Sequence, residues 1–342
     1  MRYKLLGKSG LRVSELALGT MTFGEDWGWG TAKEDCRLIF DTYAESGGNF
    51  IDTANYYTKG NSESILSDFI QTDRDYFVLA TKYSLNMNPA NLNAGGNHRK
   101  NLMQSVHASL NRLKTEYIDL LWIHAWDFTT QPEEIMRAMD DLVRMGKVLY
   151  IGISDVPAWI VAKCNTLAEC KGWTQFVGLQ IQYNLLERTV ERDLLPMADH
   201  FGLSVLAWGP LASGILTGKY QPNNLQPVEE KRLKENNPRL TEANFAIADK
   251  VVSIAKDIGC TPSNVALNWI RQRGKNIIPI IGARNLKQLN DNLDCLKVNL
   301  LPEQVAALNE CSTVKLGFPH EFLQSDNVKK LLFGENHSKL DF

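Results

Sequence analysis

The feature that most constrains the fold of this chain is a series of eight short, continuously apolar runs separated by helix-like stretches. Each run is too short for a helix and lacks the alternation of a half-exposed strand, as expected of strands buried on both faces. Strands that alternate with helices about every 30 residues indicate βαβ units and a parallel sheet. The eight runs are residues 15–20, 49–54, 77–82, 118–124, 149–154, 178–183, 203–209 and 276–282.

Two of the intervening stretches carry clear helix signals. Residues 101–113 place leucine and valine side chains on one face at helical spacing. Residues 132–145 begin with Pro and two Glu and end just before Gly146, which suits a helix start and stop. Eight units favour an α/β fold, a (β/α)8 TIM barrel, whose active sites lie at the carboxyl ends of the strands. An open doubly wound sheet is the alternative.

Three segments fall outside the eightfold pattern. The turn signal Lys8-Ser9-Gly10 predicts an N-terminal β-hairpin over residues 3–14 that caps the barrel floor. Residues 220–240 are rich in Pro, Asn, Lys and Glu, which predicts a mobile loop after the seventh strand. Residues from about 313 to 342 form an extra C-terminal segment. Because no linker divides the chain, we expect residues 1–342 to form a single domain.

Composition narrows the class of protein. Hydrophobic residues make up 44% and charged residues 22%, as in soluble globular proteins. A net charge of −2 provides no basic field, so we expect neither a nucleic acid nor a membrane as a binding partner. The sequence shows no secretory signal, no membrane span and no zinc spacing among its six cysteines, which predicts a cytoplasmic protein without a metal. The oligomeric state stays open.

Four ionisable residues lie at or just beyond the ends of consecutive predicted strands. Asp52 lies near the end of the second strand, and Tyr57 follows it by five residues. Lys82 ends the third strand and His124 ends the fourth. Alone, each suits an ordinary cap, ion pair or packing role. A barrel gathers adjacent strand ends around one mouth, so together they predict one functional cleft.

Three stretches around these residues resemble the signature motifs of the aldo-keto reductase family. They are GGNFIDTANYY at 47–57, VLATKYS at 78–84 and DLLWIHAWD at 119–127, in the order of the family. The resemblance extends from Leu5 to about Leu301. It implies a TIM barrel that uses NADP(H) to exchange hydride with a small carbonyl or alcohol substrate.

The resemblance assigns the family's catalytic tetrad to Asp52, Tyr57, Lys82 and His124. Tyr57 would act as general acid and base, because a phenol can donate its proton to a developing alkoxide. We expect Lys82 to lower the pKa of Tyr57 and Asp52 to keep Lys82 charged. His124 would donate a hydrogen bond to the substrate oxygen.

No GxGxxG motif follows a strand, so the common dinucleotide fold is not indicated. The resemblance places Ser154, Asp155 and Gln180 at the nicotinamide carboxamide and stacks Trp208 on the ring. The family usually has Asn where Asp155 stands, and a carboxylate can accept but cannot donate a hydrogen bond.

For the rest of the cofactor, the resemblance implies loop amides and Lys219 at the pyrophosphate. We expect Gly282 to begin a helix that suits a phosphate, and Arg284 to bind the 2′-phosphate of NADP. Gln288 and Asn292 would contact the adenine. The full implied set is Thr20, Met21, Asp52, Ser154, Asp155, Gln180, Trp208, Gly209, Pro210, Leu211, Ser213, Lys219, Gly282, Arg284, Gln288, Asp291 and Asn292.

Several aromatic residues fall on loops at the predicted mouth. These are Phe23, Trp27, Trp29, Tyr56 and Trp126. Loops with this many aromatics suit a pocket for an apolar or aromatic aldehyde or ketone, although aromatic walls also stack on sugars.

Two other functions fit parts of the pattern. Potassium-channel β subunits share this barrel and cofactor site and act as redox-sensing partners, but that branch typically has Asn at the position of His124. A Schiff-base aldolase would need a deprotonated Lys82, which the adjacent Asp52 opposes. Both comparisons favour a reductase.

Overall fold

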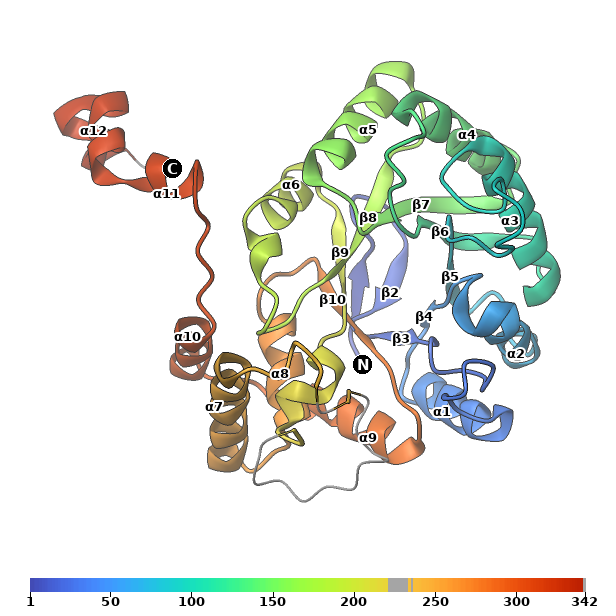
Figure 1. Cartoon of the computed structure of the whole chain (residues 1–342), viewed down its shortest axis with the longest axis horizontal. Helices are drawn as coiled ribbons and strands as arrows, with labels where there is room; N and C mark the ends of the chain where they lie inside the picture. The colour runs from blue at the N-terminus through green and yellow to red at the C-terminus, as the bar shows by residue number, and fades with distance from the viewer. Residues whose placement is uncertain (221–232, 235, 341–342) are drawn as a thin grey trace.

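The computed structural model of the chain describes residues 1–220, 233–234 and 236–340. Its centre is a closed barrel of eight parallel strands in the order β10-β3-β4-β5-β6-β7-β8-β9, which confirms the predicted (β/α)8 barrel and excludes the open sheet (Figure 1). The strands are β3 (Ala17–Gly19), β4 (Phe50–Asp52), β5 (Val78–Tyr83), β6 (Ile118–Ile123), β7 (Val148–Ser154), β8 (Phe176–Gln182), β9 (Ser204–Trp208) and β10 (Ile277–Ile281).

Helices surround the barrel (Figure 1). Those that follow successive strands are α1 (Lys33–Glu45), α2 (Asn61–Ile70), α3 (Arg99–Leu113), α4 (Pro132–Arg144), α5 (Ala158–Lys171), α6 (Leu194–Phe201), α8 (Pro262–Arg271) and α9 (Leu286–Asp294). Two more, α7 (Glu242–Ile258) and α10 (Pro302–Cys311), pack against each other, and α7 also packs on α8. The predicted loop at 220–240 lies largely outside the described residues.

The barrel interior is filled by side chains. Trp122 of β6 is fully buried there, among inward-facing residues such as Phe50 and Leu206. Gly152 and Gly178 make room for its ring: a Cβ on Gly152 would lie 2.3 Å from the indole, and one on Gly178 would lie 2.8 Å from it. The barrel is therefore a packed core, and ligands must bind at one of its ends.

The predicted N-terminal hairpin is confirmed as β1 (Tyr3–Leu5) and β2 (Arg12–Ser14), paired antiparallel. The Lys4 Nζ atom donates to the carbonyl oxygen of Ile277 at 2.7 Å, and the backbone nitrogen of Gly7 donates to Ser204 Oγ at 2.7 Å. Ile277 and Ser204 are the first residues of β10 and β9, so the hairpin covers the amino-terminal floor of the barrel. The carboxyl-terminal mouth is left for the site.

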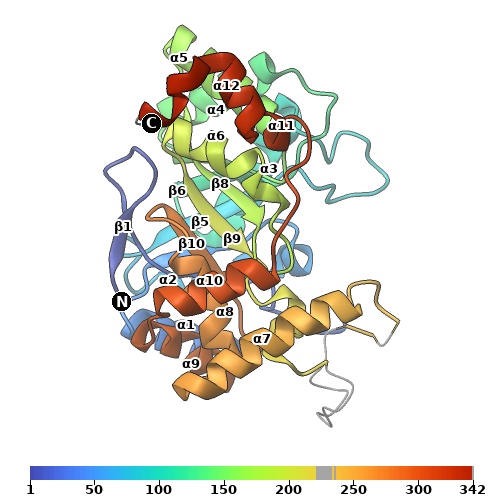
Figure 2. The same ribbon diagram turned by 90° about the vertical axis from the view of Figure 1, so that its left-hand side faces the viewer.

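The chain continues past α10 into an arm formed by α11 (His320–Gln324), α12 (Asp326–Phe333) and the 3-10 helix η6 (Gly334–Lys339). An extended stretch carries the arm away from α10, and the arm lies outside the helix ring (Figure 1). In the view turned by 90°, α11 and α12 are drawn in front of α6, on the side that faces the viewer (Figure 2). The prediction of an extra C-terminal segment is thus confirmed.

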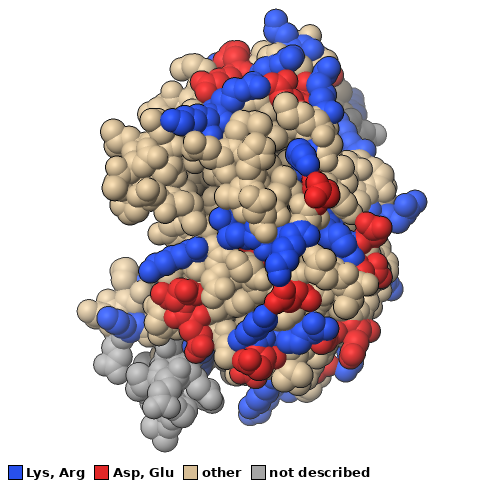
Figure 3. All heavy atoms as spheres, turned by 90° about the vertical axis from the view of Figure 1, so that its right-hand side faces the viewer, with Lys and Arg blue, Asp and Glu red and all other residues tan. Residues whose placement is uncertain are grey.

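The surface over α1–α4 mixes acidic and basic side chains (Figure 3). Several of them pair with one another: Asp68 contacts both Lys33 and Lys114, and Arg37 contacts Asp41. Such exposed pairs contribute little stability. Within the described ranges, no helix combines the length and apolar character needed to cross a bilayer.

Candidate active site

The four predicted catalytic residues converge at the carboxyl-terminal mouth. Asp52 is the last residue of β4, and His124 directly follows β6. Lys82 is the penultimate residue of β5 rather than the last, because the strand continues to Tyr83. Tyr57 opens the 3-10 helix η1 (Tyr57–Gly60) in the loop after β4.

Lys82 is the centre of the group, and its side chain is fully buried. Its Nζ atom donates to Asp52 Oδ2 at 2.5 Å, to the Thr53 carbonyl oxygen at 2.9 Å and to the Tyr57 hydroxyl at 3.2 Å. Burial by itself lowers the pKa of Lys82, but Asp52 and Tyr57 outweigh burial and the net pKa is raised. The ammonium is therefore charged at neutral pH, which disfavours its use as a Schiff-base nucleophile.

The Asp52 carboxylate is buried and accepts hydrogen bonds on both oxygens. One oxygen accepts from Lys82, and the other accepts from Gln180 Nε2 of β8 at 2.8 Å. That second bond uses the amide nitrogen of Gln180 and does not occupy its carboxamide oxygen. Gln180 thus ties the tetrad to the strands on the opposite side of the barrel.

The Tyr57 hydroxyl is a protonated phenol at neutral pH. Burial raises the pKa of Tyr57, and the positive charge of Lys82 lowers it by less, so the net pKa is above the ordinary value. As expected, Lys82 lowers the pKa of Tyr57, but desolvation raises that pKa by more. A protonated phenol beside an ammonium suits proton donation.

His124 is a neutral imidazole. Burial and the nearby charge of Lys82 lower the pKa of His124 to about 3. Its ring meets the Tyr57 ring edge-on with centroids 5.9 Å apart. Nδ1 is buried with no hydrogen-bond partner among the described residues. A neutral ring beside the phenol can donate one N–H to a substrate oxygen.

The backbone that follows Tyr57 is strained. Thr58 and Lys59 have left-handed φ values of 46° and 56°, which β-branched residues such as threonine rarely adopt. Thr58 is fully buried; its Oγ1 donates to the Phe23 carbonyl oxygen and accepts from the Ser62 backbone nitrogen, both at 2.9 Å. The sequence analysis missed this support for Tyr57, because nothing in the residue types signals a left-handed threonine.

An aromatic wall stands beside the tetrad. The Trp27 ring lies 5.5 Å from Trp29, 6.1 Å from Tyr56 and 6.4 Å from Tyr57, measured between centroids. Trp29 and Tyr56 are exposed. Three of the predicted substrate residues are therefore grouped at the mouth.

The other two predicted substrate residues lie deeper. Phe23 lies in the loop between β3 and α1, but its ring is fully buried and packs edge-on against Phe69, so its role in binding substrate stays a prediction. Trp126 is also buried, with its side chain in the core cluster around α3 and α4. Both are apolar side chains next to loops, a position from which sequence cannot distinguish core from pocket.

Groups suited to a carboxamide lie at the ends of β7 and β9. Ser154 Oγ is buried with no partner among the described residues. Asp155 has a left-handed φ of 44°, and its Oδ1 accepts from Trp208 Nε1 at 3.1 Å. The pKa of Asp155 is raised overall. Desolvation raises this pKa by more than the hydrogen bond from Trp208 and the charge of Lys82 lower it. The unpaired Ser154 hydroxyl, with Gln180 nearby in β8, fits an amide ligand.

The loop after β9 carries the residues predicted to hold the pyrophosphate. Gly209 and Pro210 lead into Leu211 and the 3-10 helix η3 (Ala212–Thr217), where Ser213 and Gly214 have φ values of 57° and 91°. The backbone nitrogens of Ala212 and Gly214 donate to the carbonyl oxygens of Gly209 and Leu211, at 2.9 and 2.8 Å, so these two amides hold the loop itself. The Lys219 side chain lies over this loop, since a Cβ on Gly214 would be 2.8 Å from Lys219 Nζ.

The predicted phosphate helix begins four residues later than expected. Helix α9 starts at Leu286 with Asn285 as its N-cap, because the Asn285 side chain accepts from the backbone nitrogen of Gln288. Gln288 Oε1 accepts from the backbone nitrogen of Arg284 at 3.0 Å, and Asn292 Nδ2 donates to the Gly282 carbonyl oxygen at 3.1 Å. Gln288 and Asn292 thus shape the 282–285 loop itself.

The predicted cofactor set also includes Thr20, Met21 and Asp291. Thr20 is buried, and its Oγ1 donates to the Asp52 carbonyl oxygen at 3.2 Å. Met21, next along the chain, is half-buried. The carbonyl oxygen of Asp291 in α9 accepts from Asn264 Nδ2 at 2.6 Å.

Comparison with known proteins places this geometry in a family. Residues 15–313 match the aldo/keto reductase family, so the chain belongs to that family. It is 36% identical to norsolorinic acid reductase of Aspergillus flavus, over 93% of this chain and 83% of that protein. It is 35% identical to a putative aryl-alcohol dehydrogenase of Saccharomyces cerevisiae (95% and 90% covered). The identity to an aryl-alcohol dehydrogenase [NADP(+)] of Phanerodontia chrysosporium is also 35% (95% and 87% covered).

These relatives and the family support an oxidoreductase that acts on small carbonyl or alcohol substrates. Proteins of this family generally use a nicotinamide cofactor, which the groups at the ends of β7, β8 and β9 fit.

Proposed function

We propose that this protein is an NADP(H)-dependent aldo-keto reductase that transfers hydride between nicotinamide and a small aldehyde, ketone or sugar. Tyr57 is its general acid and base. The observation that carries the proposal is the buried hydrogen-bonded chain from Asp52 through Lys82 to the Tyr57 hydroxyl, at the open mouth of the barrel.

When bound, the nicotinamide supplies or accepts the hydride. The residues of the chain act on the substrate oxygen and its proton. In reduction, Tyr57 donates its proton to the developing alkoxide, and the Lys82 ammonium stabilises the phenolate that remains. Asp52 balances the buried charge of Lys82 before the transfer, and afterwards the one ammonium contacts both the carboxylate and the phenolate.

His124 orients the substrate. Because its pKa is about 3, it stays neutral throughout the physiological range and donates a hydrogen bond without competing for the proton of Tyr57. The aromatic wall of Trp27, Trp29 and Tyr56 favours an aryl aldehyde or ketone. The names of the relatives, aryl-alcohol dehydrogenase and norsolorinic acid reductase, support the same choice.

The choice of NADP over NAD rests on Arg284. A guanidinium on the 282–285 loop provides a planar fork for a 2′-phosphate. A relative with 35% identity is named as an NADP(+) enzyme, which supports this assignment.

All six cysteines are free thiols, in keeping with a cytoplasmic, reducing setting.

The test is Tyr57→Phe, compared with wild type in two assays. Quenching of tryptophan fluorescence measures NADPH binding, and oxidation of NADPH with 4-nitrobenzaldehyde measures turnover. We expect unchanged binding and a fall in turnover of at least about 100-fold. Turnover near wild type in the variant would refute the role of Tyr57. If the wild-type protein binds NADPH tightly but reduces none of the carbonyl compounds tried, a redox-sensing binding subunit is favoured instead.

A further inference from the structure

The C-terminal arm exposes most of its apolar side chains. Within α11 and α12, which the structure describes in full, only Val328 is buried. Six large residues are 45–77% exposed: Phe318, Phe322, Leu323, Leu331, Leu332 and Phe333. A unit of this size with one buried side chain cannot stabilise its own fold, and exposed apolar patches of this kind mark interfaces.

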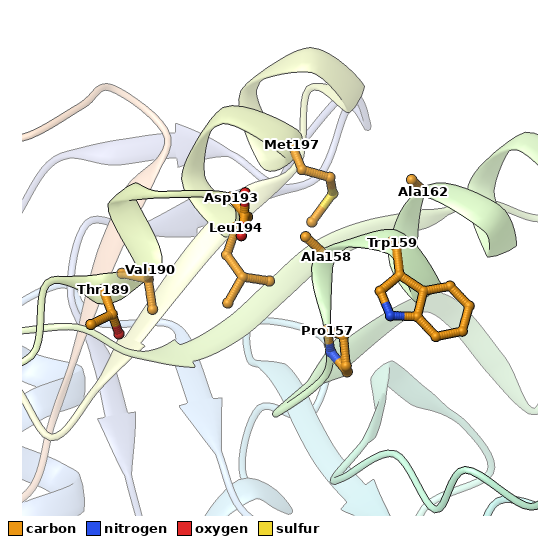
Figure 4. A pocket seen from close by; sticks show the side chains of 9 residues that line it. All are labelled: Pro157, Ala158, Trp159, Ala162, Thr189, Val190, Asp193, Leu194 and Met197. Atoms are coloured by element: carbon orange, nitrogen blue, oxygen red, sulfur yellow. The ribbon is translucent and has the colours of Figure 1, made fainter. Parts of the chain in front are cut away.

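A matching apolar groove lies on the barrel side of the same chain. It has a volume of about 600 Å³ and lies between the start of α5 and the segment from Thr189 to Met197. Side chains from the two sides face each other across it, with Trp159 and Ala162 on α5 and Leu194 and Met197 on α6 (Figure 4). Trp159 is 62% exposed, which is unusual for a tryptophan without a partner.

The groove and the arm meet at one point. Arg192 Nη2 donates to the Phe318 carbonyl oxygen at 2.7 Å, and His320 Nε2 lies 3.4 Å from Oδ1 of Asp193, which lines the groove. From this anchor the arm turns outward, and α12 lies clear of α5 and α6 (Figure 1). Helices α11 and α12 therefore do not fill the groove of their own chain, and most of their large apolar side chains stay exposed.

We infer that the arm is an exchange element that seats in the α5–α6 groove of a second copy of this chain. In a two-fold dimer, the arm of each copy lies in the groove of the other copy. The exposed apolar surfaces of the arm and of the groove are then both buried. At roughly 200 Å² per large side chain, the exposed parts of the six arm residues amount to about 700 Å². If half of each arm is covered by an equal area of groove, the pair buries about 1,400 Å², within the range of a stable dimer.

The experiment uses the full-length protein and light scattering after size-exclusion chromatography. Wild type is expected at twice the chain mass. Leu332→Glu on the arm and Trp159→Glu in the groove are each expected at the mass of one chain. Both side chains are exposed, so neither substitution disturbs the barrel core. Leu92→Glu, at a residue that is 95% exposed and remote from arm and groove in the sequence, is the matched control and stays dimeric.

Mixing the two monomeric variants is the decisive step. The Leu332→Glu protein keeps an intact groove and the Trp159→Glu protein keeps an intact arm, so an equimolar mixture restores one of the two native junctions. With half of the buried area, this heterodimer is expected to be weaker than the wild-type dimer, so its mass is followed while the protein concentration is raised. Recovery of the dimer mass in the mixture supports exchange. A monomeric wild type overturns the inference. So does a dimer that survives both substitutions, or a mixture of folded variants whose mass rises no more with concentration than that of either variant alone.

Discussion

Removing the Thr58 hydroxyl tests how the loop that carries Tyr57 is held. Thr58→Val keeps the volume and the β-branching, so the cost of the left-handed backbone is unchanged and only the two hydrogen bonds at Oγ1 are lost. Their partners, the Phe23 carbonyl and the Ser62 amide, belong to fully buried residues. At about 1–2 kcal/mol for each buried group left unsatisfied, we expect the free energy of unfolding to fall by about 2–4 kcal/mol.

Urea unfolding followed by far-UV circular dichroism measures this loss. Thr58→Ser is the matched variant: it keeps the hydroxyl and removes one methyl, so its loss is expected near 1 kcal/mol. Thr313→Val, at an exposed threonine, controls for loss of a surface hydroxyl and is expected within about 0.5 kcal/mol of wild type. If Thr58→Val is as stable as wild type, or Thr58→Ser is as unstable as Thr58→Val, the hydroxyl does not hold the loop.

Three further predictions concern charge. Lys82→Met leaves Asp52 buried without its cation and should cost about 3–5 kcal/mol in urea unfolding, part of which Asp52→Asn restores in the double variant; an unaffected single variant would contradict the ion pair. His124 has a folded pKa of about 3, below its ordinary value, so the unfolded chain binds a proton first as pH falls and stability is lost on acidification. Between pH 7.5 and pH 5 the wild type should lose about 2 kcal/mol more than His124→Asn, and equal losses would refute the lowered pKa. Arg284→Ala should weaken NADPH binding by about 10- to 100-fold and leave NADH unchanged, measured by fluorescence titration; an unaltered ratio of the two affinities would argue against the 2′-phosphate contact.

The barrel was predictable because buried parallel strands leave a strong signal. Each of the eight apolar runs coincides with an observed strand, with ends that differ by a few residues. The strand before Lys82 runs one residue further than predicted, and the one before His124 stops one residue earlier. Because successive strands end at the same mouth, the convergence of the tetrad followed from the strand pattern alone.

What the sequence could not supply is the local backbone and the degree of burial. Phe23 is a loop residue, but its ring is part of the buried core. The helix near Gly282 begins at Leu286, because Asn285 caps it and the intervening residues form a loop. The net pKa of Tyr57 depends on how far burial outweighs Lys82, which is a balance of distances in space. None of these can be read from residue order.

The seam of the barrel has a consequence for biosynthesis. β3 is the first strand of the barrel in chain order, and it pairs with β10, the last, through Ala17–Ile280 and Leu18–Ile281. Across the same seam, the Thr22 hydroxyl donates to the Ala283 carbonyl oxygen at 2.7 Å, beside the loop that carries Arg284. A chain emerging from the ribosome therefore holds its first strand with an unpaired edge until residue 281 is made. Premature termination or a slow stretch of translation before that point leaves an open, aggregation-prone sheet, so dependence on chaperones should concentrate in this interval of synthesis.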